Sequence, residues 1–255
     1  MKNRVVVSPF FLDQDLPPLE RFASGGRQLN KPQRDGGDRL ARMSAVHQPL
    51  ARFVAQAVRE GDRPVSIAGD CCAPIGVLAG LQAAGLQPTI VWLDAHGDFN
   101  TPETSPSGFI AGMALAMIVG RGDQELTRAA GLVTHPEAGV FLADARDLDP
   151  GEADALRNSA VHHVPRLADL PQRLPASPLY VHLDVDVLSP SDAPATLYPT
   201  AGGPSLAEAC AVMESLAATG QVAAVSMTVW DFGQDGDGRT ERACTQLLQA
   251  LVGEW

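Results

Sequence analysis

Residues 89–100 read TIVWLDAHGDFN, an apolar run that passes directly into acidic and imidazole side chains. The first five residues are β-branched or apolar, which is typical of a strand buried on both faces of a sheet. Further strands are predicted at residues 5–7, 65–68, 140–143, 161–164, 179–183 and 222–229. Apolar residues at helical spacing predict helices at residues 38–60, 73–84, 109–119, 205–218 and 239–252. Such alternation predicts an α/β fold with a parallel sheet covered on both faces.

The alternation runs through the chain without a linker or a repeat, so residues 1–255 are predicted to form one domain. Residues 13–37 are rich in proline, glycine and charge, and are predicted to form a loop. Pro49 lies within the predicted helix 38–60 and can kink or split it.

The composition limits the partners and the compartment. The chain has 255 residues with 30 acidic and 19 basic side chains, a net charge of -11, which argues against nucleic-acid and anionic-membrane partners. Its four cysteines form no CxxC pair, which fits a reducing compartment. The sequence shows no signal peptide and no apolar stretch of membrane-spanning length. We therefore expect a cytoplasmic protein.

Carboxylates gather where predicted strands end. Asp94, His96 and Asp98 follow one strand at alternate positions, and Asp184 and Asp186 follow another. Alternate residues of an extended chain share a face, and the carboxyl ends of parallel strands are where ligands bind. Oxygen-rich ligation with one imidazole favours Mn²⁺ or Mg²⁺ over a structural zinc, and this many ligands suits two metal ions. The alternative is that each aspartate caps a helix or turn.

Two segments resemble signatures of the arginase–agmatinase (ureohydrolase) family. They are VWLDAHGDFNTPETSPSG at 91–108 and HLDVDVLSPSDAPAT at 182–196, and AGDCC at 68–72 stands where the family has GGDHS. The resemblance covers most of the chain. It implies a three-layer α/β/α fold with a mainly parallel sheet and a di-manganese site that hydrolyses guanidino groups. The residues that match metal ligands of the family are Asp94, His96, Asp98, Asp184 and Asp186.

Cys71 stands at the position of the family's first ligand histidine. A thiolate binds metals but is a softer ligand than imidazole and an unusual one for Mn²⁺. Cys71 is therefore either a metal ligand or an inert buried thiol beside a weak or absent second metal. We favour the ligand, because Asp70 and the helix start beside it are kept.

The resemblance separates the two ends of the substrate site. Asn100 and Ser107 match residues that hold the α-carboxylate of the substrate in arginases, and Asp149 matches the residue that meets the α-ammonium. These three can also be simple turn formers. They imply a small-molecule amino-acid substrate.

The guanidino end departs from the family. Ala111 stands where arginases have a proton-carrying histidine. The acidic residue that pairs with the guanidinium in arginases is also missing, its position falling at or near Val229–Trp230. Leu197 and Tyr198 replace small residues beside the same end.

Together, Cys71 and Ala111 resemble the Nω-hydroxy-L-arginine amidinohydrolases of D-cycloserine biosynthesis. This resemblance implies hydrolysis of Nω-hydroxy-L-arginine to L-ornithine and hydroxyurea in antibiotic biosynthesis. Water bridging two Mn²⁺ ions would attack the guanidino carbon, and Asp98 would carry the proton. The alternatives are an arginase or other guanidino hydrolase, a non-catalytic regulatory homologue, and a plain metal-binding or structural domain.

Two smaller expectations complete the prediction. The resemblance implies trimers or hexamers, often assisted by a C-terminal tail, but the sequence stops at Trp255 just past the last predicted helix, which favours a monomer. His182 precedes Asp184 by two residues on the same strand face, and we expect a packed strand histidine.

Overall fold

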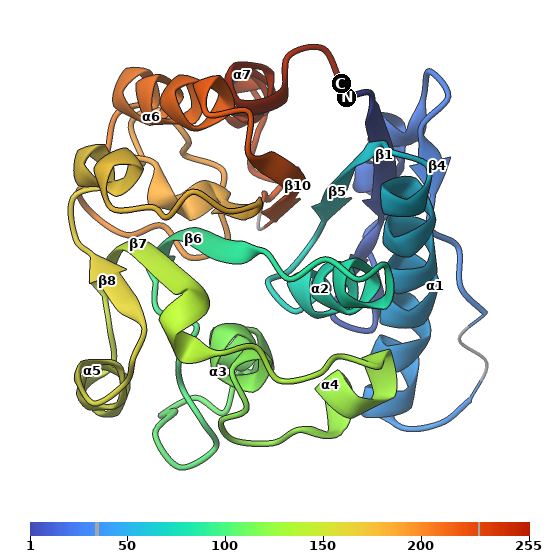
Figure 1. Cartoon of the computed structure of the whole chain (residues 1–255), viewed down its shortest axis with the longest axis horizontal. Helices are drawn as coiled ribbons and strands as arrows, with labels where there is room; N and C mark the ends of the chain where they lie inside the picture. The colour runs from blue at the N-terminus through green and yellow to red at the C-terminus, as the bar shows by residue number, and fades with distance from the viewer. Residues whose placement is uncertain (34–35, 229) are drawn as a thin grey trace.

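A computed structural model describes residues 1–33, 36–228 and 230–255. Within them, one sheet of eight strands has the order β4-β1-β5-β10-β9-β6-β7-β8, and its neighbouring strands pair in parallel. The strands are β1 (Asn3–Ser8), β4 (Gln28–Leu29), β5 (Arg63–Ala68), β6 (Thr89–His96), β7 (Val140–Asp147), β8 (His162–Val164), β9 (Leu179–Asp184) and β10 (Val222–Thr228). The predicted parallel sheet is therefore confirmed (Figure 1).

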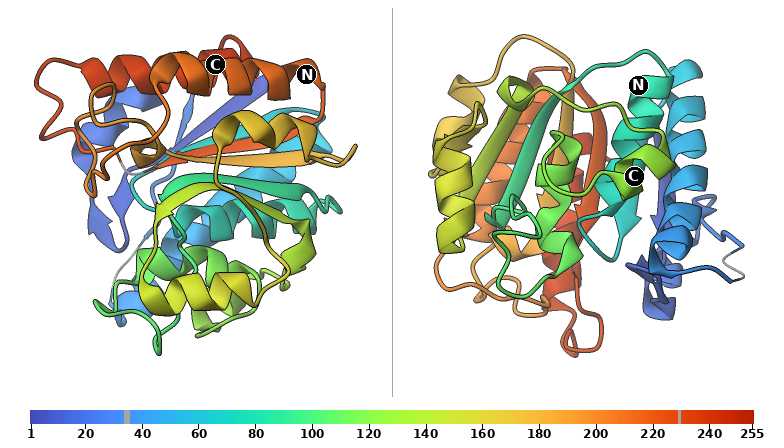
Figure 2. Two further views of the ribbon diagram at one scale, coloured as in Figure 1. Left: turned by 90° about the vertical axis from the view of Figure 1, so that its left-hand side faces the viewer. Right: turned by 90° about the horizontal axis from the view of Figure 1, so that it is seen from below.

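Helices cover both faces of the sheet (Figure 2). One face carries α1 (Arg39–Arg59), α2 (Ala73–Ala83), α3 (Ala114–Ile118), α4 (Glu125–Ala130) and α5 (Pro150–Arg157), and the other carries α6 (Leu206–Ala218) and α7 (Arg239–Val252). Each layer has its own buried core. On β6, Ile90 and Trp92 enter the first core while Val91 and Leu93 enter the second. This alternation confirms a three-layer α/β/α fold.

Short elements fill the connections. They are the antiparallel pair β2 (Phe10–Phe11) and β3 (Gln14–Asp15), and the 3₁₀ helices η1 (Pro17–Ala23), η2 (Ile110–Met113), η3 (Glu137–Gly139), η4 (Leu167–Gln172) and η5 (Val185–Val187). The prediction of a loop over residues 13–37 is therefore wrong for β3, η1 and β4. Leu19 and Phe22 of η1 are buried in the second core, because removing apolar side chains from water is favourable.

The helix predictions match the structure in part. Pro49 lies inside α1, which runs unbroken through it. The predicted helix 109–119 is divided into η2 and α3, and α4 and α5 were not predicted. Position 229 of the predicted last strand lies outside the described residues. Among the described residues, no helix is both long and apolar enough to cross a membrane.

Candidate metal centre and active site

The ends of β6 and β9 have the same local construction. Asp94 Oδ1 accepts a hydrogen bond from the backbone N–H of His96 at 2.7 Å, and Asp184 Oδ1 accepts one from Asp186 at 2.9 Å. In each case the strand's last apolar residues anchor an aspartate whose carboxylate holds the backbone two residues on. Each aspartate therefore stabilises a turn through its Oδ1, as the alternative interpretation expects. Its Oδ2 can still make other contacts.

The two strand ends also contact each other. Asp186 Oδ1 accepts a hydrogen bond from the backbone N–H of Ala95 at 3.2 Å. His96 Nδ1 lies 3.1 Å from Asp186 Oδ2 and 3.4 Å from Asp94 Oδ1. Burial alone would lower the pKa of His96, but hydrogen bonds to Asp186 and Asp94 raise it to about 12. The imidazole thus lies between two carboxylates that favour its protonated form.

Asp98 follows a bend rather than the extended strand. β6 ends at His96, and Asp98 has a φ of +48°, so the extended spacing predicted for three ligands holds only for the first two. Asp98 is still buried in the same place, and its Oδ2 has no hydrogen-bond partner within residues 1–33, 36–228 and 230–255. A non-glycine residue with positive φ is strained and is characteristic of functional sites.

The buried carboxylates repel one another. Burial raises the pKa values of Asp94, Asp98 and Asp184, and the neighbouring carboxylates add to the rise. A divalent cation would offset this repulsion and give Asp98 Oδ2 a partner. The residues therefore fit a metal centre.

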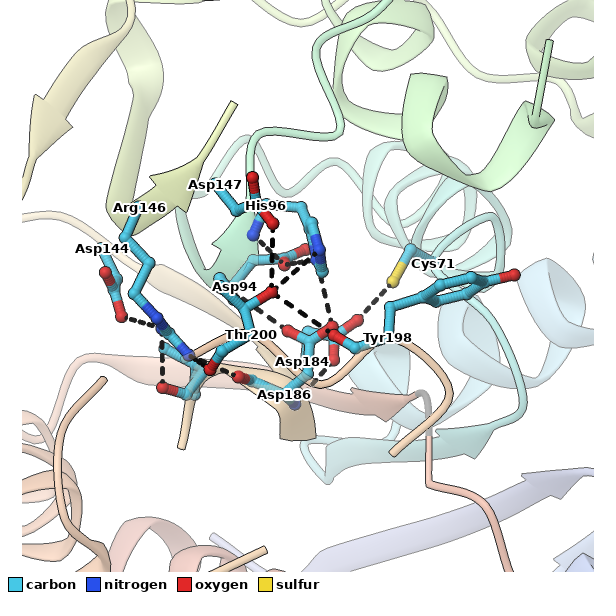
Figure 3. A network of polar contacts seen from close by, with 12 residues as sticks. Cys71, Asp94, His96, Asp144, Arg146, Asp147, Asp184, Asp186, Tyr198 and Thr200 are labelled. Carbon is cyan, nitrogen blue, oxygen red and sulfur yellow. Dashed lines mark hydrogen bonds and ion pairs between the residues drawn. The ribbon is translucent and has the colours of Figure 1, made fainter. Parts of the chain in front are cut away.

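Cys71 lies at this centre, just after β5. Its Sγ is buried and donates a hydrogen bond to Asp184 Oδ2 at 2.8 Å (Figure 3). Thr228 Oγ1 lies 3.2 Å from the same sulfur. Burial, and then the charges of Asp184, Asp98 and Asp94, raise the pKa of the thiol. A metal ion would be needed to hold Cys71 as a thiolate here.

Among the residues that the structure describes, two groups of side chains each offer ligand atoms that lie within 4.8 Å of one another. One is Asp94, His96 and Asp186, and the other is Cys71, Asp94 and His182. Asp94 belongs to both, as expected for a residue between two metal positions. The second group contains His182, which sequence reasoning treated as packing.

A cavity of about 620 Å³ opens beside these groups. The sequence-predicted residues that line it are Cys71, His96, Asp98, Asn100, Ser107, Asp149, Asp184 and Asp186. Asn100 Nδ2 donates a hydrogen bond to Asp149 Oδ2 at 2.9 Å, and Asn100 Oδ1 accepts one from Thr104 at 2.9 Å. The cavity therefore brings the predicted amino-acid contacts and metal-ligand candidates together.

Asp149 is held by a helix that was not predicted. It is the N-cap of α5 in a capping box with Glu152, whose Oε2 accepts a hydrogen bond from the Asp149 backbone at 3.2 Å. Glu152 Oε1 accepts from the backbone N–H of Phe99 at 2.8 Å. The spacing of Asp149, Pro150 and Glu152 is a capping signature and could have indicated this helix.

Arg146 is a further residue that sequence reasoning missed. It pairs with Asp144 and donates to the backbone carbonyls of Asp186 at 3.1 Å and Thr200 at 3.0 Å (Figure 3). It thereby joins β7, the turn after β9 and the loop at 200. Nothing local in the sequence identifies such long-range contacts.

The cavity wall also contains the predicted departures. Ala111 and Tyr198 both line it, and the Tyr198 ring lies 5.4 Å from that of Phe109. Trp230 is buried in the second core against Phe22. Val229, the other position expected to face the guanidinium, lies outside the described residues.

Residues 26–253 match the model of the arginase family. The chain belongs to the arginase family. The arginase of Bacillus caldovelox is 35% identical over 86% of this chain and 79% of its own length. The arginase of Bacillus subtilis is 30% identical over 90% of this chain and 83% of its own. The crystal structure of the Bacillus cereus arginase has a TM-score of 0.84 and 28% identity, and the match covers 100% of this chain and 99% of that one.

Family membership makes this chain a hydrolase of linear amidine C–N bonds. Arginase-family proteins typically hold a binuclear metal site, and the described residues include two candidate ligand groups. The ureohydrolase resemblance and the arginase-like fold are thus confirmed.

Proposed function

We propose that this arginase-family hydrolase cleaves Nω-hydroxy-L-arginine to L-ornithine and hydroxyurea with two Mn²⁺ ions, in antibiotic biosynthesis of the D-cycloserine type. We further propose that the protein is a cytoplasmic monomer and binds neither nucleic acid nor membranes. The net charge of -11 supports the absence of these two partners.

The residues that would hold the two ions are Cys71, Asp94, His96, Asp98, Asp184 and Asp186. Five of them offer carboxylate or imidazole ligands, which suits Mn²⁺. Asp94 belongs to both ligand groups, and Asp184 contacts Cys71 as well as the backbone of Asp186. When bound, the metal pair supplies Lewis-acid charge and activates water for hydrolysis.

The amino-acid end of the substrate would lie against Asn100, Ser107 and Asp149. The Asn100 amide has a second N–H beyond the one given to Asp149, and the Ser107 hydroxyl is exposed at the cavity wall. Both can donate to an α-carboxylate, while Asp149 can accept from an α-ammonium. A decarboxylated substrate would not need two such donors.

The composition of the cavity wall carries the proposal. The polar side chains of Asn100, Ser107 and Asp149 line it, while Ala111, which also lines it, has no group that transfers protons. An N-hydroxyguanidine is less basic than a guanidine and needs less of an acidic partner. Its own hydroxyl can also relay protons that an unmodified guanidine cannot.

The reaction adds water across one bond. Oxygen bonds to the guanidino carbon, the bond from that carbon to Nδ breaks, and Nδ gains a proton to become the side-chain amine of ornithine. Asp98 would carry that proton, because it is buried at the cavity and its Oδ2 makes no hydrogen bond inside the described residues.

The test is product identity. Mn²⁺-loaded protein given Nω-hydroxy-L-arginine should form ornithine and hydroxyurea in equal amounts, and failure to form hydroxyurea contradicts the proposal. An arginase acting on unmodified L-arginine is the second candidate, which the 35% identity to a Bacillus arginase favours.

A further inference from the structure

His182 lies on β9, two residues before Asp184, and is completely buried. Its ring is fixed from two sides. The Trp92 ring packs on it with 4.0 Å between ring centroids, and its Nδ1 lies 2.9 Å from Ser226 Oγ. Ser226 Oγ in turn lies 2.6 Å from the Tyr180 hydroxyl. The imidazole therefore has one defined orientation.

That orientation leaves the second ring nitrogen unused. His182 Nε2 is buried and finds no hydrogen-bond partner in the part of the chain that the structure describes. Cys71 Sγ, an Asp94 carboxylate oxygen and a His182 ring nitrogen all lie within 4.8 Å of one another. Since Nδ1 is taken by Ser226, Nε2 is the nitrogen available to this group.

We propose that His182 binds a metal ion through Nε2 and completes a thiolate, carboxylate and imidazole ligand set with Cys71 and Asp94. This inference rests on the metal centre of the proposed function and assigns it one more ligand. The position on the Cys71 side then differs from the position at Asp94, His96 and Asp186, because it has a sulfur ligand.

The second contacts of the ring agree with this role. A metal-binding histidine commonly donates its other N–H to a nearby oxygen, which fixes the ring and leaves the lone pair for the metal. Ser226 Oγ can accept from Nδ1–H in this way. In the opposite tautomer, Nε2–H would be a buried donor without an acceptor among the residues described.

Co²⁺ is the probe for this position, because thiolate bound to Co²⁺ gives a charge-transfer absorption and imidazole and thiolate both suit the ion. Metal-free full-length protein would be titrated with Co²⁺, and the charge-transfer band would report occupation beside Cys71. We expect His182→Gln to shift this titration to Co²⁺ concentrations about tenfold higher or more.

His47→Gln is the matched control. His47 is also buried, on α1, and its Nδ1 likewise has no partner within the described ranges. It belongs to neither ligand group. We expect this variant to titrate like the wild type. An unchanged titration of a folded His182→Gln protein would overturn the inference.

X-ray absorption of the wild-type protein with Co²⁺ gives an answer that needs no variant. We expect imidazole scattering from both His96 and His182, and scattering from only one imidazole over both ions overturns the inference. A wild type that binds no Co²⁺ removes the metal centre and this ligand together. Normal Co²⁺ binding that depends on His182, without hydroxyurea production, supports the ligand and overturns only the proposed substrate.

Discussion

Cys71 Sγ lies 2.8 Å from Asp184 Oδ2, so a thiol after β5 and a carboxylate at the end of β9 share one buried contact. β10 lies between these two strands in the sheet, and its Thr228 completes the contact. The thiol proton of Cys71 makes this contact, and a bound metal cation would take the place of that proton.

The first prediction concerns this contact. Cys71→Ala should lower bound Mn²⁺ by about one ion or weaken its binding at least about tenfold, because a ligand is lost. Cys71→His should bind Mn²⁺ more tightly than the wild type, since imidazole is the harder ligand. Equilibrium dialysis with metal analysis measures both.

The control for Cys71 is Cys210→Ala, a half-buried cysteine on α6 outside the cavity. Its metal content should equal that of the wild type. Unchanged metal content and rate in Cys71→Ala would show that Cys71 is no ligand.

The second prediction concerns the amino-acid end of the substrate. Asn100→Ala removes the donor proposed for the α-carboxylate and the partner of Asp149, so KM should rise about tenfold or more with a smaller change in kcat. Steady-state kinetics at saturating metal measures the split. Ser215→Ala, on α6, removes a comparable polar group away from the cavity and should change neither constant. A fall in kcat alone would contradict the assigned role.

The third prediction concerns Arg146. Arg146→Ala leaves the largely buried Asp144 without its ion pair and frees backbone carbonyls at Asp186 and Thr200. We expect a loss of about 3 kcal/mol in the free energy of unfolding, measured by urea denaturation. Arg157→Ala breaks an ion pair whose side chains are both 68% exposed, and should cost well under about 1 kcal/mol. Equal costs for the two variants would contradict this account.

The fourth prediction is a pH dependence of stability. Burial lowers the pKa of His47 to about 4, from an ordinary value of 6.5. Below pH 6.5 the unfolded chain takes up a proton that the folded chain excludes, so this group lowers stability as the pH falls toward 4. The loss between pH 7 and 5 is about 2 kcal/mol.

His47→Gln removes this contribution. Urea unfolding at pH 7 and pH 5 should show a smaller acid-induced loss of stability in His47→Gln than in the wild type. Other titrating groups cancel in that comparison. His162→Gln, which changes an exposed histidine on β8, should behave like the wild type. Identical losses in His47→Gln and the wild type would contradict the burial of a neutral imidazole.

The sheet and the metal-ligand candidates could be predicted from the sequence because both depend on local patterns. Apolar strands such as 89–93 are recognisable by composition, and parallel order brings their carboxyl ends to one edge. The charges of Asp94 and Asp184 therefore act on each other although 90 positions separate the two residues.

Other parts of the site depend on tertiary packing. Arg146 gains its role only when three distant segments converge, and the unpartnered nitrogen of His182 exists only because Trp92 and Ser226 orient the ring. The helix after Asp149 is different, since its capping signature was present in the sequence.

The most direct test of the central claim is the ratio of kcat/KM for Nω-hydroxy-L-arginine to that for L-arginine, measured on the same Mn²⁺-loaded protein with ornithine as the common product. We predict a ratio well above one, because the amino-acid contacts serve both substrates while the wall at Ala111 lacks a proton-transferring group that unmodified arginine needs. A ratio below one would contradict it and identify an ordinary arginase.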